Sequence, residues 1–167
     1  MKFDLIVAAD DKRGIGKNNT LPWHIKQDLH RFATITRESA VIMGRKTWES
    51  IPESRRPLKD RINIVLTTDK NYKLPENVEL ASSLEQAIES ANTKNVQKTF
   101  IIGGGKLFAQ AIKNPDCHTI WYTRVKGDFH CDAFFPEIPQ EFVSVGTSSD
   151  FTEGNYTFCF EVYRKRS

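Results

Sequence analysis

The sequence predicts an α/β fold with a single domain: a mostly parallel twisted sheet with flanking helices and an antiparallel hairpin at the C-terminal end. Over the first two thirds of the chain, short apolar runs alternate with amphipathic segments, which is typical of parallel strands joined by helices. From Thr119 onward, apolar runs follow one another without helical segments between them. The length of 167 residues favours one domain over residues 1–167, with no second enzyme domain fused to it.

The first half of the chain is predicted to hold three strands and two helices. The apolar run 3–9 predicts a buried strand, and a polar, glycine-containing loop over 10–24 follows it. Ile25, Leu29 and Phe32 recur at helical spacing, which predicts an amphipathic helix over 25–36. We further predict strands over 40–43 and 63–67, with a short helix that begins in 44–48.

The second half is predicted to start with two helices and a strand and to end in strands alone. Leu84, Ala87, Ile88 and Ala91 mark a helix, and a strand over 99–102 leads through three glycines into a helix ending near Ala111. The C-terminal strands are expected over 120–125, 134–135, 142–145 and 156–163.

Ligands of such sheets bind where the carboxyl ends of the strands meet the loops. Four segments are expected at that edge: the 10–24 loop, Gly44-Arg45, Thr67-Thr68 and Gly103-Gly104-Gly105. The sequence therefore predicts that the binding site is assembled from segments far apart in the chain.

The composition excludes several classes of protein. No apolar run is long enough to span a membrane, and the N-terminal residues predict a strand rather than a secretory signal. Cys117, Cys131 and Cys159 form no C-x-x-C pair, which favours a reducing, cytoplasmic location. The doublets Cys117-His118 and His130-Cys131 predict no metal site, because adjacent strand residues point to opposite faces. A net charge of +3 is too small to imply a nucleic-acid partner.

One carboxylate stands on the apolar face of the first predicted helix. Asp28 precedes Phe32 by four residues and therefore shares its face with Leu29. Burying a carboxylate is unfavourable unless it has a partner. Asp28 either lies at the edge of the stripe in water or binds a ligand. A carboxylate can accept two parallel N–H bonds, which suits the 2-amino-4-oxo pyrimidine edge of a heterocycle.

Two strand-to-helix junctions have features of anion sites. The triplet Gly103-Gly104-Gly105 would let backbone approach a diphosphate, although an ordinary turn explains it too, and the G-x-G-x-x-G pattern fails at Phe108. Gly44-Arg45-Lys46-Thr47 places two cations at a helix start, where they oppose the helix dipole. A bound anion explains these cations better than helix stability does, and a chance surface arrangement is the alternative.

Taken together, the order and spacing of these segments resemble the dihydrofolate reductase family over essentially the whole chain. The matching stretches include Ile6-Val7-Ala8-Ala9, Leu21-Pro22-Trp23, the run from Val41 to Pro52, the run from Arg56 to Asn63, Ile101-Ile102-Gly103-Gly104-Gly105 and Phe134-Phe135-Pro136. The resemblance implies an NADPH-dependent oxidoreductase that reduces 7,8-dihydrofolate to 5,6,7,8-tetrahydrofolate for one-carbon metabolism. It also implies a monomer and a target of antifolates.

The resemblance further implies roles for individual substrate-binding residues. Asp28 would bind the pterin, Thr123 would hold the carboxylate of Asp28, and Trp23 would help to place a bound water. Arg61 would bind the glutamyl α-carboxylate, for which a guanidinium suits better than an ammonium. The other substrate-binding residues implied in this way are Val7, Leu29, Phe32, Ile51, Leu58 and Ile102.

On the cofactor side, the resemblance implies a cis peptide between Gly103 and Gly104. The 2′-phosphate of NADPH would be recognised by Arg45, Lys46, Thr68 and Lys106, with Thr47 near the diphosphate. The remaining cofactor-binding positions implied by the family are Ala9, Ile15, Gly16, Gly44, Thr67, Gly103, Gly104, Gly105, Leu107 and Phe108.

The implied reaction passes a hydride to the pterin C6 and a proton to N5. Asp28 would lie across the ring from N5, so a water admitted past the 10–24 loop is the expected immediate proton donor. Asp132 is expected to accept hydrogen bonds from the loop backbone near Gly16 and to hold the loop closed. Two alternatives stay open: a related pyrimidine reductase of riboflavin synthesis and a folate-binding module without activity.

Overall fold

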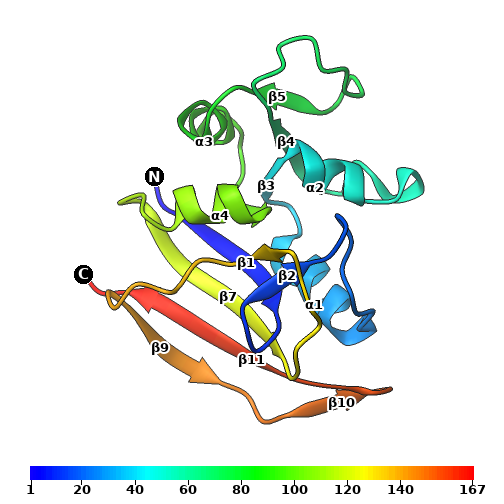
Figure 1. Ribbon diagram of the computed structural model, residues 1–167. Coiled ribbons are helices and arrows are strands. Elements are labelled where there is room, and N and C mark those ends of the chain that lie inside the picture. Colours follow the sequence, from blue (N-terminus) through cyan, green and yellow to red (C-terminus); the bar gives the residue numbers. More distant parts are fainter.

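A nine-stranded sheet runs through the molecule in the computed structural model, which describes residues 1–167 (Figure 1). The strand order is β10-β11-β7-β1-β6-β3-β4-β5, and β9 also pairs with β11. The parallel strands are β1 (Phe3–Ala9), β3 (Ala40–Gly44), β4 (Ile62–Leu66), β5 (Glu79–Ala81), β6 (Thr99–Gly103) and β7 (Cys117–Val125). The mostly parallel sheet confirms the predicted fold class.

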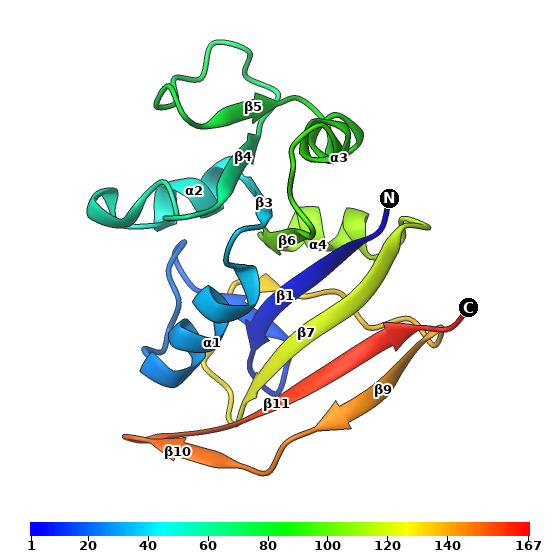
Figure 2. The same ribbon diagram turned by 180° about the vertical axis from the view of Figure 1, so that it is seen from behind.

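Helices cover both faces of this sheet, as Figures 1 and 2 show from opposite sides. They are α1 (Lys26–Thr36), α2 (Arg45–Ser50), α3 (Leu84–Asn92) and α4 (Gly105–Ala111), with a 3-10 turn at Glu53–Arg55. Successive residues of a strand point to opposite faces, so β1 contributes to two cores. Leu5 packs with α3 and α4 on one face, and Ile6 packs with Trp48 of α2 and Phe32 of α1 on the other.

The C-terminal strands are antiparallel, as predicted. They are β9 (Phe142–Thr147), β10 (Phe151–Glu153) and β11 (Tyr156–Lys165). β11 lies between β7 on one side and β9 and β10 on the other (Figure 2). No helix of the structure has the length and apolar character needed to cross a membrane.

A separate two-stranded ribbon lies across the carboxyl end of the sheet. It pairs β2 (Gly14–Gly16) with β8 (Ala133–Phe134). The sequence predicts 10–24 as a loop, whereas the structure gives its middle a strand partner that lies far along the chain. The predicted strand at 134–135 is displaced by one residue, because Phe135 leaves the ribbon and is fully buried in the core.

Other differences concern short or polar elements. The strands β5 and β10 span three residues each and were not predicted, because such short segments show no period in the sequence. β7 begins at Cys117, three residues before the predicted start. The apolar face of α1 is less buried than its periodicity suggests. Leu29 is 39% exposed, and Thr36 is the only buried residue of this helix. This face therefore lines a cavity with Leu29 and Phe32, and it also packs against the core through Phe32 and Ile35.

Candidate active site

A cavity of about 540 Å³ opens at the carboxyl ends of β1, β6 and β7. Its walls come from α1, from α2 with the turn that follows it, from the glycine triplet and from the 10–24 loop. The volume lies within the usual range of small-molecule sites. Sixteen of the predicted site residues line it: Val7, Ile15, Gly16, Asp28, Leu29, Phe32, Thr47, Ile51, Leu58, Arg61, Ile102, Gly103, Gly104, Gly105, Phe108 and Thr123.

Asp28 is the one acidic side chain in this lining. Its Oδ1 accepts a 2.6 Å hydrogen bond from the Thr123 hydroxyl, which joins α1 to β7. Burial raises the pKa of the Asp28 carboxyl, while the Thr123 hydrogen bond and the nearby Arg31 charge act in the lowering direction. Desolvation prevails, so the carboxyl holds a proton more readily than an exposed aspartate does.

Apolar side chains face one another next to Asp28. Leu29 and Phe32 come from α1, whereas Ile51 and Leu58 come from the segment after α2. This arrangement forms a slot whose two walls belong to different elements. A flat aromatic group would be desolvated on both faces in such a slot.

Arg61 stands beside this apolar slot. Its Nη1 donates to the Thr36 hydroxyl at 2.9 Å, and its Nε donates to the Lys59 carbonyl at 2.8 Å. The guanidinium carbon lies 5.8 Å from the centre of the Phe32 ring. These contacts fix the position of a cation at the wall of the cavity and leave further N–H groups for an anionic ligand.

The glycine segments lie side by side at the other part of the cavity. A Cβ on Gly44 would stand 3.9 Å from both the Gly103 carbonyl oxygen and the Gly104 nitrogen. Gly103 has a φ of +133°, which side chains rarely permit, and its peptide bond to Gly104 is cis, as the resemblance implies. Cβ atoms on Gly103 and Gly104 would each meet the Thr47 hydroxyl at 3.4 Å. Bare backbone and a hydroxyl thus converge here, which fits a diphosphate.

At position 105, glycine is required for a steric reason. A Cβ at this position would lie 2.8 Å from the carbonyl oxygen of Phe134 in β8. The third glycine of the triplet is therefore required by the neighbouring ribbon, whatever ligand binds nearby.

Several predicted cofactor residues lie outside the cavity lining. Ala9 and Leu107 are buried in the core beneath it. Arg45 forms a 2.9 Å ion pair with Glu49 one turn along α2, so part of its charge is already matched. The others outside the lining are Gly44, Lys46, Thr67, Thr68 and Lys106, of which Lys46, Thr68 and Lys106 are exposed.

Trp23 is buried beside the cavity rather than in its lining. Its ring packs edge-on against Phe129 with 5.1 Å between the ring centres. Its Nε1 is buried without a hydrogen-bond partner from the protein. An indole N–H without a partner is unfavourable in a protein interior, which fits a role in binding a water or a ligand atom.

The 10–24 loop is held over the cavity at its tip and at its base. The Asn18 N–H donates to the Asp132 carboxylate at 3.0 Å, and the Asp132 N–H donates to the Gly16 carbonyl at 2.9 Å. On the other side, the Asn19 amide donates to the Lys46 carbonyl at 3.0 Å. Asp132 thus contacts the loop near Gly16, where the resemblance places it.

The base of the loop depends on a residue that the sequence analysis did not single out. Asp10 is 1% exposed and accepts hydrogen bonds from the N–H groups of Gly14 at 2.7 Å and Phe129 at 3.0 Å. Gly14 fits only without a side chain, since a Cβ would stand 2.5 Å from the Cβ of Cys131. One feature of the sequence could have identified Asp10, namely its position directly after an apolar strand.

Sequence reasoning also missed several residues of the cavity wall. Arg31 and Arg55 carry charges there, and Arg31 could have been found from its position three residues after Asp28 on the same helix. The uncharged residues missed are Ile6, Ala8, Asn19, Thr20, Leu21, Ala33, Ser50, Pro52 and Ala133. No group of three or more His, Cys, Asp or Glu side chains lies close enough together to hold a metal ion.

Comparison with known proteins identifies the family of this chain. A sequence model of dihydrofolate reductase matches residues 2–165. The chain is 39% identical to the dihydrofolate reductase of Drosophila melanogaster, with 100% of each chain covered. It is 36% identical to that of Heliothis virescens, covering 99% of this chain and 98% of the relative, and 38% identical to that of Schistosoma mansoni, covering 98% and 96%. The chain belongs to the dihydrofolate reductase family.

Proposed function

We propose that this chain catalyses the NADPH-dependent reduction of dihydrofolate to tetrahydrofolate. The observation that carries the proposal is the Asp28–Thr123 pair at the wall of a cavity that also contains an apolar slot, the guanidinium of Arg61 and a bare glycine backbone. Each of these features matches one part of the two reactants. Membership of the dihydrofolate reductase family supports the same reaction.

The substrate would lie with its pterin against Asp28. The carboxylate can accept the 2-amino group and a ring N–H together, and Thr123 orients it for that purpose. Val7 and Ile102 would form the floor, and the slot defined by Leu29, Phe32, Ile51 and Leu58 would hold the aminobenzoyl ring. Arg61 would bind the α-carboxylate of the glutamyl tail, because its guanidinium is already fixed at the end of this slot.

NADPH would bind along the glycine segments. Gly103, Gly104, Gly105 and Thr47 would hold its diphosphate, and Arg45, Lys46, Thr68 and Lys106 would bind its 2′-phosphate. Gly44, Thr67 and the core residues Ala9 and Leu107 would support this surface, while Ile15, Gly16 and Phe108 would face the nicotinamide. The bound cofactor supplies a hydride for the pterin C6. The protein supplies position and excludes water.

Asp28 would orient the pterin and favour its protonated form, since it is the only acidic group of the cavity. A water admitted past the 10–24 loop would deliver the proton to N5, with Trp23 helping to place a bound water through its Nε1. Closure of the loop would then exclude bulk water during hydride transfer.

The direct test is NADPH oxidation, followed at its absorbance maximum, with dihydrofolate as the substrate. Asp28→Asn should fold and bind NADPH but lose about 10²–10⁴ in kcat/KM near neutral pH, the range for loss of an acid–base group. The loss should shrink at low pH, where the substrate arrives protonated. Turnover of a pyrimidine of riboflavin synthesis instead, or tight folate binding without turnover, would replace the proposal by one of the two alternatives.

We further propose that the protein is a cytoplasmic monomer without a nucleic-acid partner. Cys117, Cys131 and Cys159 are free thiols, and two of them are buried, which is typical of a reducing compartment. Analytical ultracentrifugation of the purified chain tests the oligomeric state.

A further inference from the structure

The wall of the cavity carries a cation to which the proposed reaction gives no role. Arg31 lies on α1 three residues after Asp28, so the two side chains leave the helix on neighbouring positions of one face. Both line the cavity. Arg31 is the only basic residue of α1 that lines the same cavity as Asp28.

The Arg31 guanidinium is held in place by aromatic rings. Its central carbon lies 4.1 Å from the centre of the Phe160 ring and 5.9 Å from that of Trp121. Phe160 pairs directly with Thr123 across β11 and β7. The same pair of strands thus positions the hydrogen-bond donor of Asp28 and the platform for Arg31. A guanidinium stacked on rings gains cation–π energy and loses part of its freedom to move into solvent.

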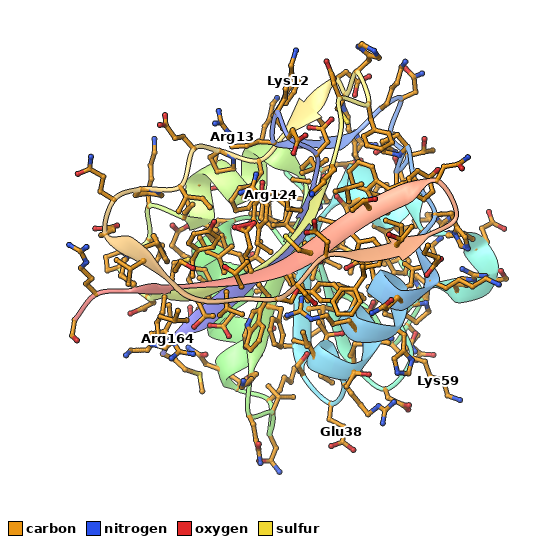
Figure 3. The ribbon with its side chains drawn as sticks, turned by 90° about the horizontal axis from the view of Figure 1, so that it is seen from below. Lys12, Arg13, Glu38, Lys59, Arg124 and Arg164 are labelled. Atoms are coloured by element: carbon orange, nitrogen blue, oxygen red, sulfur yellow. The ribbon has the colours of Figure 1, made fainter.

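The charged groups of the neighbouring strands β7 and β10 are paired with other partners. Arg124 follows Thr123 in β7, points to the opposite face of the sheet from α1 and binds Glu161 at 2.7 Å (Figure 3). Glu153 of β10 accepts the N–H groups of Lys26 and Gln27 at the start of α1. The lining residues of β1 and of the 10–24 loop are uncharged.

Two further arginines, Arg55 and Arg61, line the cavity from the segment after α2, and Arg61 contacts the C-terminal end of α1 through Thr36. Burial raises the pKa of Asp28, and the one charge that opposes this rise is that of Arg31. An arginine stays protonated at every pH at which the protein is folded, so this influence is constant.

We propose that Arg31 is a positioning residue that acts on Asp28: fixed on the Phe160 ring, its guanidinium stabilises the anionic form of the Asp28 carboxylate on the wall of the cavity that both residues share. The effect acts through space, since the hydrogen bond to Asp28 comes from Thr123. The Arg31 charge would keep the Asp28 carboxylate anionic over a wider range of pH, so that it can accept hydrogen bonds from the N–H groups of a ligand. The expected effect of Arg31 on the reaction rate rests on the proposed folate reduction. The effect of the Arg31 charge on the Asp28 carboxyl does not.

The test is the titration of the Asp28 carboxyl carbon by NMR in the protein without ligands, with Asp28→Asn to assign the signal. Arg31→Met removes the charge and retains the length of the side chain. It should raise the midpoint by about one pH unit, the lower end of the effect of a nearby opposite charge. Arg31→Lys should restore most of the wild-type midpoint. Arg37→Met, at the exposed end of the same helix, removes one positive charge as well and should leave the midpoint in place.

The second readout is the pH profile of kcat/KM for dihydrofolate, which reports ionisation of the free enzyme. Its midpoint should move in the same direction in Arg31→Met and return in Arg31→Lys. An unchanged carboxyl titration in Arg31→Met would overturn the inference, and so would equal displacement in Arg31→Met and Arg31→Lys, because shape and not charge would then matter. A wild-type protein without dihydrofolate turnover would refute the proposed function and leave the NMR result to decide the role of Arg31.

Discussion

The Thr123 hydroxyl and the Asp28 carboxylate are joined by a hydrogen bond of 2.6 Å, although the two residues are 95 positions apart in the chain. Thr123 is 3% exposed, so its hydroxyl lies largely out of bulk water. A hydrogen bond to a charged group in such surroundings contributes about 1.5–3 kcal/mol. This bond fixes the direction of the carboxylate relative to the sheet.

Thr123→Val should therefore weaken the charged form of Asp28 and loosen its orientation. Valine has nearly the same shape as threonine but donates no hydrogen bond. We expect kcat/KM for dihydrofolate to fall by about 10- to 100-fold at neutral pH, as the energy of the lost bond implies. The pKa of Asp28 should rise further, because a hydrogen bond to the charged form is removed.

Thr119→Val is the matched control, since Thr119 is buried on the same strand, and its hydroxyl contacts His118 outside the cavity. The pH profile of kcat/KM for both variants measures the effect. If the two variants behave alike, Thr123 has a role in packing only.

Asp28 should also make stability depend on pH. Its pKa in the folded protein is raised above the ordinary value near 3.8. The unfolded chain therefore loses this proton first, and the free energy of unfolding falls as the pH rises through the ordinary value towards the folded one. In Asp28→Asn the free energy of unfolding does not fall for this reason, because asparagine does not ionise. The Tm difference between Asp28→Asn and wild type should thus grow in favour of the variant from pH 4 to pH 8.

Calorimetry at both pH values measures this difference, with ~2–4 °C expected for each kcal/mol in a chain of this size. A Tm difference that stays constant would mean that Asp28 ionises as easily in the folded protein as in the unfolded chain, and one that shrinks towards pH 8 would mean that it ionises more easily in the folded protein.

The contact between Asp132 and the 10–24 loop gives a prediction about rate. Asp132→Ala removes the acceptor of the Asn18 N–H, which lies 3.0 Å away. The loop should close less often, so the hydride step should slow in single-turnover measurements and NADPH should bind more weakly. The free energy of unfolding should change by only ~0.5–1.5 kcal/mol, because the bond is exposed.

Asp150→Ala serves as the control, as it removes an exposed carboxylate that pairs with Lys126 in another part of the protein. A collapse of stability in Asp132→Ala with an unchanged hydride rate in the folded fraction would assign Asp132 to the fold and not to loop closure.

The cations beside the glycine segments predict the choice of cofactor. Arg45 and Lys106 would each contribute a charge-assisted bond of ~1.5–3 kcal/mol to a 2′-phosphate, so NADPH should be preferred over NADH by at least about two orders of magnitude. The double variant Arg45→Met, Lys106→Met should weaken NADPH and leave NADH nearly unchanged. Isothermal titration with each cofactor measures this.

Glu49 refines the cofactor prediction, because it already pairs with Arg45 at 2.9 Å and accepts the Tyr72 hydroxyl at 2.7 Å. Glu49→Gln should release Arg45 and tighten NADPH without affecting NADH. An equal loss of both cofactors in the double variant would show that Arg45 and Lys106 serve the diphosphate or the fold.

The sequence by itself determined the order of the main elements and most of the cavity wall. Apolar runs such as 3–9 and 40–43 were sufficient to predict parallel strands, because strands buried on both faces are apolar throughout. The position of Asp28 on an apolar helix face was visible as well, since helical periodicity is a local property. Local patterns of this kind need no knowledge of which segments meet in space.

Only the tertiary structure decided which partners these residues have. Arg31 reaches Phe160, and Asp10 ties Gly14 to Phe129, each across more than one element. The contact of Thr123 with Asp28 was implied by the family resemblance and not by any local pattern, and the structure gives it a length of 2.6 Å. The tertiary structure also showed that the apolar face of α1 lines a cavity and that Glu49 matches part of the charge on Arg45. Periodicity along a chain states which side of an element is apolar, whereas packing between elements decides whether that side meets the core, a ligand or a charge.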